Sequence, residues 1–164
     1  MLSERTLPVA PGTAAAKLLA EGAAGLGMAK LPWSKAQLQF RDRVNFLRRA
    51  EGDEWPDLSD RALARTATDW LAPFLDGKTA LSQVVADDLA AALDVLVPWT
   101  LRHRLNAEAP THFMAPSGSN VPIDYEGEEG PKLAIRVQGL FGLAVHPVIA
   151  RGHVPLLIEL RSPA

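Results

Sequence analysis

The sequence predicts an α+β fold, with a bundle of four to five short helices over residues 1–110 and a small mixed or antiparallel β unit over residues 111–164. Before Pro110, apolar residues recur at the three- and four-residue steps of amphipathic helices. After Pro110, short runs of β-forming residues are broken by proline and glycine. The composition, 48% hydrophobic and 22% charged, is that of an ordinary globular protein.

The first two predicted helices precede residue 52. The first covers residues 11–25 and contains three glycines, so it needs packing partners to be stable. The second begins after Ser34, whose hydroxyl can satisfy an unpaired backbone N–H of the first turn. Phe40, Val44 and Leu47 follow at helical spacing and define its apolar face.

Three further helices are predicted between residues 59 and 110. The third begins after Ser59 as N-cap, and Pro73 shortens or kinks its last turn. A fourth helix starts near Asp87, and a short fifth helix starts at Pro98 and Trp99. Short loops between amphipathic helices of this kind are sufficient for a compact helical subdomain.

The predicted β unit contains a hairpin and two later strands. Residues 111–115 and 120–125 form the hairpin around the turn at 116–119, and residues 133–137 form the next strand. Residues 154–160 are predicted to form a buried strand, with Pro155 near its start or on an edge. Because the chain stops directly after that strand, we expect it to be a truncated part of a longer parent protein.

The composition limits the classes of function. A formal net charge of -2 gives the whole molecule no general attraction for nucleic acid, so such binding needs a local basic face. The absence of cysteine excludes disulfides, thiolate catalysis and zinc sites built on sulfur, and it fits the reducing cytoplasm. No apolar run approaches the roughly 20 residues that span a bilayer. We therefore expect a cytoplasmic protein with no membrane contact.

Two short motifs resemble functional sites only superficially. Gly77-Lys78-Thr79 matches the end of a phosphate-binding loop, but the second glycine of that loop is replaced by Ala72 and no buried strand precedes it. A turn that ends a helix is the better interpretation. Ser117 and Ser119 flank a glycine, but the order of elements favours a hairpin turn over a nucleophile elbow.

Histidines and clustered acids are the remaining candidates for chemistry. The histidines lack an acidic partner at ligand spacing; they are His103, His112, His146 and His153. The acids of one loop could hold a divalent ion but are more typical of a solvated loop; they are Asp124, Glu126, Glu128 and Glu129. We predict no catalytic, cofactor-binding or metal-binding residue, with an enzyme using Asp124, His112 or His153 as a minor alternative.

The second predicted helix is basic. Its cations are Lys35, Arg41, Arg43, Arg48 and Arg49. They form either a solvated helix face or a contact strip for a phosphate backbone or an acidic partner. Arg41 and Arg48 are placed opposite the apolar face, so charge reversal there is expected to weaken binding without unfolding the domain.

The tryptophans mostly lie beside proline or within apolar stripes. They are Trp33, Trp55, Trp70 and Trp99. We expect core and helix-entry anchors rather than platforms for base stacking.

Nine stretches resemble, in order and spacing, the C-terminal region of bacterial HrpB-type ATP-dependent helicases. They are residues 31–35, 43–49, 55–60, 69–75, 109–112, 116–119, 123–125, 137–142 and 160–164. The resemblance implies kinship with the DEAH/RHA branch of superfamily 2 helicases, whose motor domains bind and hydrolyse ATP. Nothing in this chain matches the motor, so ATP and Mg²⁺ are expected only in motor domains that it lacks.

The resemblance implies a non-catalytic accessory region that braces the motor of the same parent chain and contacts nucleic acid. Single-stranded or structured RNA is the expected nucleic acid, with the basic residues of the second helix as its contact. The alternative is a protein-interaction module that docks on the motor or on another protein, and binding that ignores salt would favour it.

Overall fold

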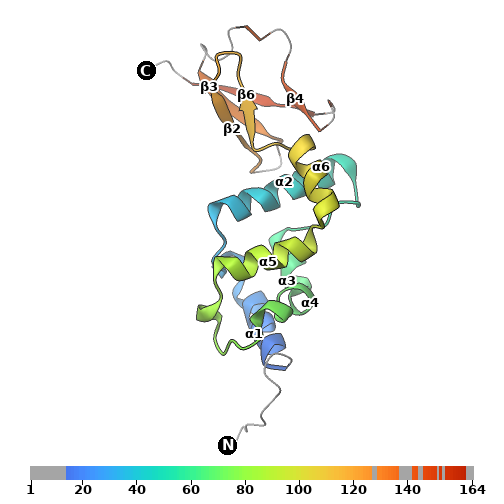
Figure 1. Cartoon of the computed structure of the whole chain (residues 1–164), viewed down its shortest axis with the longest axis vertical. Helices are drawn as coiled ribbons and strands as arrows, with labels where there is room; N and C mark the ends of the chain where they lie inside the picture. Colours follow the sequence, from blue (N-terminus) through green and yellow to red (C-terminus); the bar gives the residue numbers. More distant parts are fainter. Residues whose placement is uncertain are drawn as a thin grey trace, which may run out of the picture. The chain divides into compact units, whose positions relative to one another are not determined.

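The computed structural model describes residues 14–126, 129–136, 142–143, 146–150, 152 and 154–161. Within these residues it contains six α-helices, a four-stranded mixed sheet and a separate two-stranded ladder (Figure 1). The predicted α+β class is confirmed.

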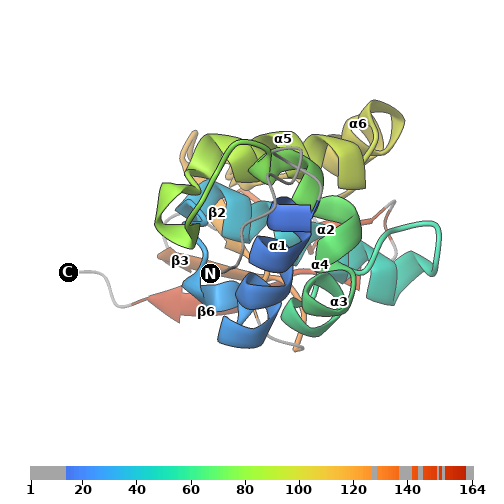
Figure 2. The ribbon, with the colours of Figure 1, turned by 90° about the horizontal axis from the view of Figure 1, so that it is seen from below.

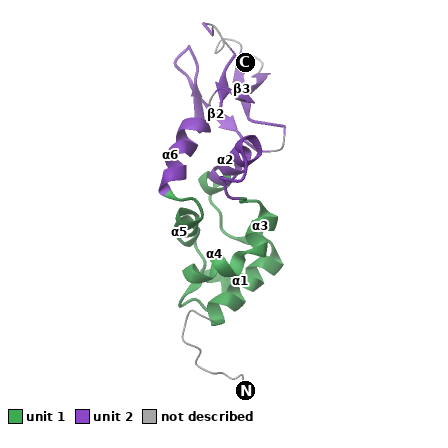
Figure 3. Cartoon of the chain, turned by 90° about the vertical axis from the view of Figure 1, so that its right-hand side faces the viewer, with its two compact units in different colours: residues 1–38, 57–98 green, residues 39–56, 99–164 purple. Residues whose placement is uncertain are grey.

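Two compact units make up the chain, and they do not divide it at residue 110 (Figure 3). The first unit comprises residues 1–38 and 57–98, and the second comprises residues 39–56 and 99–164. Helices do give way to strands near residue 110, as expected. The second unit nevertheless includes helical segments, because a small sheet must bury its apolar face against another element to be stable.

The first unit is helical. Its α-helices are α1 (Ala14–Leu26), α3 (Asp60–Arg65), α4 (Ala67–Trp70) and α5 (Ala86–Leu96), joined by 3₁₀ turns at Met28–Lys30, Ala72–Leu75 and Leu81–Gln83. The buried face of α1 consists of Ala16, Ala20 and Ala23. These small side chains let α1 lie close beside α3 and α4 (Figure 2).

The third predicted helix is in fact three short elements, α3, α4 and the 3₁₀ turn Ala72–Leu75. Ser59 caps its start as predicted, since its Oγ accepts from the Ala62 N–H at 3.2 Å. The break occurs at Thr66, whose hydroxyl donates to the Ala62 carbonyl at 2.9 Å. A threonine hydroxyl that bonds to the carbonyl four residues earlier competes with helical geometry, and this local competition is not visible in the apolar periodicity.

Tryptophan side chains form part of the core of the first unit. Trp70 is 4% exposed, and its indole N–H donates to the Leu63 carbonyl at 2.7 Å. The Trp33 ring stacks on it with centroids 6.2 Å apart and donates to the Met28 carbonyl at 2.9 Å. Both rings serve as anchors, as the sequence predicts.

The start of α2 (Lys35–Glu51) is a reciprocal cap. The Ser34 Oγ accepts from the Gln37 N–H at 3.1 Å, and the Gln37 Oε1 accepts from the Ser34 N–H at 2.9 Å. The Gln37 amide also donates to the Ala86 carbonyl at the start of α5, at 2.9 Å. The first two bonds satisfy backbone donors that the start of a helix leaves unpaired, and the third links α2 to α5.

Replacing Ser34 with alanine is expected to lower the free energy of unfolding by about 1 kcal/mol, the usual cost of losing an N-cap oxygen. Urea unfolding followed by far-UV circular dichroism measures it. Ser34→Asp is the matched control, because aspartate retains an oxygen acceptor and should cost only a few tenths of a kcal/mol. Equal losses in both variants would contradict the capping role.

The second unit combines most of α2, α6 (Trp99–Glu108) and the strands. The sheet contains β1 (His112–Met114), β2 (Asn120–Asp124), β3 (Lys132–Arg136) and β6 (Leu157–Arg161), in the order β1-β2-β3-β6. The first two pairings are antiparallel and β3 pairs parallel with β6. A separate ladder joins β4 (Val148–Ile149) to β5 (Val154–Pro155).

The predicted hairpin is confirmed, whereas the predicted buried strand over residues 154–160 is wrong. That segment divides at Leu156 into β5 and β6. Leu156 is buried, but Leu157 and Leu160 are 43% and 58% exposed. The reason is that β6 is an edge strand of the sheet, so an apolar run does not imply burial on both faces.

The core of the second unit joins α2 to the sheet. The Phe46 and Tyr125 rings lie 5.4 Å apart, and Ile123, Leu133 and Ile135 of the sheet are buried. The Tyr125 hydroxyl donates to the Pro110 carbonyl at 2.6 Å, at the connection between α6 and β1. Burial raises the pKa of Tyr125, so its hydroxyl remains a donor at neutral pH.

Candidate nucleic-acid interface

The five predicted contact cations do not share one exposed strip. Lys35 and Arg49 are exposed and Arg48 is half-buried, whereas Arg41 and Arg43 are each only 6% exposed. The prediction that Arg41 lies on a solvated face is therefore wrong. Helical spacing identifies the apolar face of α2. It does not show whether the polar face is also buried, because that depends on tertiary packing.

Arg43 links α2 to the end of α6. Its Nε donates to the Ala109 carbonyl at 2.7 Å, and its Nη2 donates to Oδ1 of Asn106 at 2.9 Å. Burial lowers the pKa of Arg43 from its high ordinary value. The guanidinium nevertheless stays charged at physiological pH, because arginine is effectively always protonated in proteins. Arg43 is thus a structural cation.

Arg48 closes the loop that follows α2. Its Nη1 donates to the Trp55 carbonyl at 2.8 Å, and its Nη2 lies 3.4 Å from the Asp53 carboxylate. Charge reversal at Arg41 or Arg48 would therefore disturb the fold. The expectation that such variants change binding alone is not tenable.

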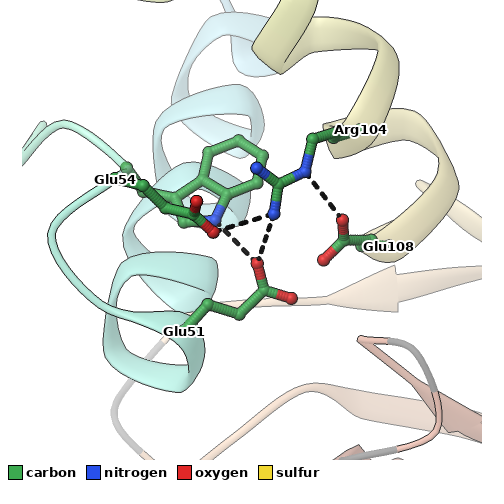
Figure 4. Close-up of polar contacts among 5 residues, drawn as sticks. Glu51, Glu54, Arg104 and Glu108 are labelled. Atoms are coloured by element: carbon green, nitrogen blue, oxygen red, sulfur yellow. Dashed lines mark hydrogen bonds and ion pairs between the residues drawn. The ribbon is translucent and has the colours of Figure 1, made fainter.

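Arg104 on α6 is the centre of a cluster of carboxylates (Figure 4). Its Nη2 lies 3.0 Å from Glu51 and 2.8 Å from Glu54, and its Nε lies 3.1 Å from Glu108. Its guanidinium carbon is 5.2 Å from the centroid of the Trp55 ring, whose N–H donates to Glu51 at 2.9 Å. Hydrogen bonds to Glu54 and Glu108 raise the pKa of Arg104. The cluster ties α6 to the end of α2.

A second face of α6 borders a hollow on the surface of the second unit. Trp99, Arg102, His103 and Asn106 recur at three- and four-residue steps and so lie on one side of the helix. Trp99 is 81% exposed. Together with Phe40 of α2 and two deeper residues, these four side chains line a hollow of about 290 Å³. The two deeper residues are Arg43 and Leu105.

Arg102 is held in place at this hollow. Its guanidinium carbon lies 4.6 Å from the centroid of the Phe40 ring, within the range of a cation–π interaction. The described lining includes two arginines and one histidine and no carboxylate. Arg43 is buried, so Arg102 supplies the accessible guanidinium of this hollow, on a chain whose formal net charge is -2. An aromatic face beside a positioned guanidinium can stack a planar group and bind a phosphate.

Sequence reasoning missed this surface. It is correct that Trp55 and Trp70 are buried anchors, but the same interpretation is wrong for Trp99. Trp99 opens α6 directly after Pro98, and a tryptophan next to proline predicts a helix-entry anchor, which its exposure contradicts. The sequence does contain a signal for this surface, because the helical spacing of Trp99, Arg102 and His103 places the three side chains on one side of α6.

The segment that resembles a phosphate loop is a turn. Gly77 has φ +83°, which an L-residue with a side chain rarely adopts. The Lys78 amine lies 3.2 Å from the Asp88 carboxylate, and the Thr79 N–H donates to Gln83 at 2.7 Å. The groups that would bind phosphate thus have intramolecular partners, and these residues do not fit a nucleotide phosphate.

The serine pair and the histidines show no catalytic arrangement. Ser117 and Ser119 lie in the β1–β2 turn, where Gly118 has φ +92° and its N–H donates to the Ala115 carbonyl at 2.9 Å. The His112 Nδ1 lies 2.9 Å from the hydroxyl of its neighbour Thr111. The His146 Nε2 lies 2.7 Å from the Leu156 carbonyl. His153 is outside the described residues.

The acidic loop that could hold a divalent ion does not form a metal site within the described residues. In the part of the chain that the structure describes, no three histidine or acidic residues gather closely enough to hold one. Glu128 is outside that part. Glu129 lies 2.6 Å from the Lys132 amine. Burial, followed by the nearby charges of Glu126 and Asp124, raises the pKa of Asp42 on α2.

None of the described helices has both the length and the apolar character that crossing a membrane would require.

Comparison with known proteins relates the chain to one helicase family. The family model described as ATP-dependent helicase C-terminal matches residues 70–164. The chain is 36% identical over 139 residues to the ATP-dependent RNA helicase HrpB of Escherichia coli strain K12, covering 84% of this chain and 17% of that protein.

Two solved structures are similar to the chain. The crystal structure of the E. coli DExH-box NTPase HrpB matches 88% of it with a TM-score of 0.75 and 36% identity. The crystal structure of the Escherichia coli DEAH/RHA helicase HrpB matches 94% of it with a TM-score of 0.77 and 32% identity. The chain spans only 18% and 20% of those two proteins.

Proposed function

Because this chain belongs to the family of ATP-dependent helicase C-terminal regions typified by HrpB, we propose that it is a non-catalytic accessory region of an HrpB-like RNA helicase. In this role it braces the motor domains of its parent protein and contacts nucleic acid. One observation carries the proposal: the likeness covers 84% of this chain but only 17% of the E. coli helicase. The chain thus corresponds to a part of such an enzyme.

The side chains of this region do not support nucleotide binding, which is assigned to the motor domains of the parent protein. The turn at Gly77 offers no site for a nucleotide phosphate, because Lys78 already pairs with Asp88. ATP and Mg²⁺ would therefore bind in the motor domains of the parent protein. The absence of cysteine is in keeping with the cytoplasm as the compartment of the parent protein.

The contact with nucleic acid is supported by the basic face of α6 rather than by the strip predicted on α2. Trp99, Arg102 and His103 combine an indole, a guanidinium and an imidazole on one helix face. Of the predicted cations of α2, Lys35 and Arg49 are exposed, whereas Arg41 and Arg43 are buried.

A protein-docking role has one observation in its favour. On α1, Leu18 and Leu26 are 68% and 63% exposed, and Gly22 and Gly25 lie between them. An apolar strip with small residues suits the close approach of another protein surface. Docking of this strip on the motor would serve the same bracing role.

A graft experiment tests the proposal. The E. coli helicase HrpB would be prepared intact, without the stretch matched by this chain, and with this chain grafted in that place. RNA-stimulated ATP hydrolysis is measured against RNA concentration. The deletion should raise the RNA concentration needed for half-maximal stimulation by tenfold or more, as expected when about 1.4 kcal/mol of binding is lost, and the graft should restore it.

ATP hydrolysis without RNA serves as the control for an intact motor. If that basal rate is kept while the deletion leaves the response to RNA unchanged, the accessory role in RNA contact is contradicted. If the deletion abolishes the basal rate and the graft restores it, bracing is the dominant role. A Leu18→Ser/Leu26→Ser graft that fails to restore the basal rate would assign bracing to α1.

A further inference from the structure

We propose that the hollow on α6 is a stacking site for one unpaired base of single-stranded RNA, with Trp99 beneath the base and Arg102 at an adjacent phosphate. The proposal rests on the nucleic-acid contact proposed above and assigns it to particular side chains. It moves the contact from the predicted cations of α2 to the exposed face of α6.

The exposure of Trp99 is the first argument. Tryptophan is the side chain with the largest apolar surface, and it is normally buried to a large extent. The other tryptophans follow that rule, since Trp55 is 0% and Trp70 is 4% exposed, and Trp33 is half-buried. Trp99 is 81% exposed although the chain has a well-formed core in the same unit. A ring left in solvent at the rim of a hollow offers its face to a planar ligand.

The placement of Arg102 is the second argument. The Phe40 ring holds its guanidinium at 4.6 Å, so a flexible side chain is oriented before any ligand binds. Arg102 follows Trp99 by three residues and therefore lies on the same side of α6. A base stacked on Trp99 would bring its own backbone phosphate to this side, where the His103 ring also lies.

The composition of the hollow matches a base with its phosphate. Its described lining includes arginine side chains and aromatic rings but no carboxylate. Leu105 is buried, so the accessible apolar groups are the rings of Phe40 and Trp99. A base can stack on an exposed ring while its phosphate contacts Arg102. Duplex RNA keeps its bases stacked inside the helix, so a site of this kind selects unpaired strands.

The test uses the full 164-residue chain with Trp99→Leu, Trp99→Phe and Arg102→Gln variants. Fluorescence anisotropy measures binding of a labelled single-stranded RNA, a duplex RNA, a single-stranded DNA and an RNA with abasic positions. Trp99→Leu should weaken single-strand binding by about tenfold to a hundredfold, the usual effect of losing one stacked base. Trp99→Phe should retain most of the affinity, since phenylalanine keeps an aromatic face.

Two further readouts bear on the roles of the two residues. Arg102→Gln should reduce the slope of log affinity against log salt by about 1, because one phosphate contact is lost. The tryptophan fluorescence of the unsubstituted chain should be quenched when single-stranded RNA binds, and this quenching should be absent in Trp99→Phe. Circular dichroism checks that each variant is folded, as expected for replacements of an exposed ring.

The outcomes separate this site from the wider proposal. If the chain binds single-stranded RNA and Trp99→Leu binds it equally well, the stacking site is wrong but the nucleic-acid contact stands. If the chain binds no RNA at low salt, both are wrong. Tighter binding to DNA than to RNA would overturn the choice of ligand. Equal affinity for the abasic RNA would overturn stacking.

Discussion

Replacing Trp70 with alanine is expected to lower the free energy of unfolding by about 4 kcal/mol. The Trp70 ring is 4% exposed, stacks on Trp33 at 6.2 Å and donates a hydrogen bond to the Leu63 carbonyl at 2.7 Å. Truncation removes the apolar contacts, leaves a cavity between the helices of the first unit, and orphans a buried carbonyl. Urea unfolding followed by circular dichroism measures the loss.

Two variants are matched controls for this prediction. Trp70→Phe keeps an aromatic ring but loses the N–H donor, so it should cost clearly less, about 1–2 kcal/mol. Trp99→Ala removes a ring of the same type that is 81% exposed, and it should change stability by less than about 0.5 kcal/mol. Equal losses for Trp70→Ala and Trp99→Ala would contradict the difference in burial.

Replacing Arg104 with methionine is expected to cost about 3 kcal/mol in the stability of the second unit. The variant keeps the length of the apolar stem but removes a guanidinium that contacts Glu51, Glu54 and Glu108. The side chains of Glu51 and Glu108 are each only 8% exposed, so their negative charges would lose a nearby cation within a poorly solvated region. Thermal and urea unfolding at neutral pH report the effect.

The control for the Arg104 prediction is Glu54→Gln. The Glu54 side chain is 49% exposed, and an exposed ion pair contributes at most about 1 kcal/mol because water and salt screen it. Lowering the pH should also reduce the difference in free energy of unfolding between Arg104→Met and the unsubstituted chain, because protonated carboxyl groups do not need a nearby cation. A gap that is unchanged at acidic pH would show that lost packing, not charge, destabilises the variant.

Local sequence signals were sufficient for most elements of the fold. The Ser34 and Ser59 caps mark the starts of α2 and α3 correctly, because a cap is a contact between residues three positions apart. The β1–β2 hairpin was predicted from its turn for the same reason. The break at Thr66 and the split at Leu156 were missed, because each depends on a hydrogen bond or a neighbouring strand that periodicity does not report.

The candidate site was less predictable than the fold. Five cations on one helix suggested a strip, yet Arg43 bonds to Ala109, which is 66 residues further along the chain. Whether an arginine faces solvent or a carbonyl is decided by such distant contacts. The basic face of α6 became evident only with the exposure of Trp99 and the position of Arg102 over Phe40. Both depend on tertiary packing of α2 and α6.

The arginines of the second unit divide into two kinds. Arg43, Arg48 and Arg104 satisfy carbonyls and carboxylates within the chain and hold α2, α6 and their loops together. Arg102 also contacts a side chain of its own unit, the Phe40 ring, and it lies at the rim of a hollow beside an exposed tryptophan.

The most direct test of the account is a titration of the 164-residue chain against single-stranded and duplex RNA by fluorescence anisotropy, over a series of salt concentrations. An accessory region that contacts RNA through Trp99 and Arg102 should bind the single strand more tightly than the duplex. Its affinity should fall as salt rises, with a log–log slope of about -0.7 to -1.4 for one or two phosphate contacts with a single strand. No binding at low salt, or an affinity that does not change with salt, would contradict the account.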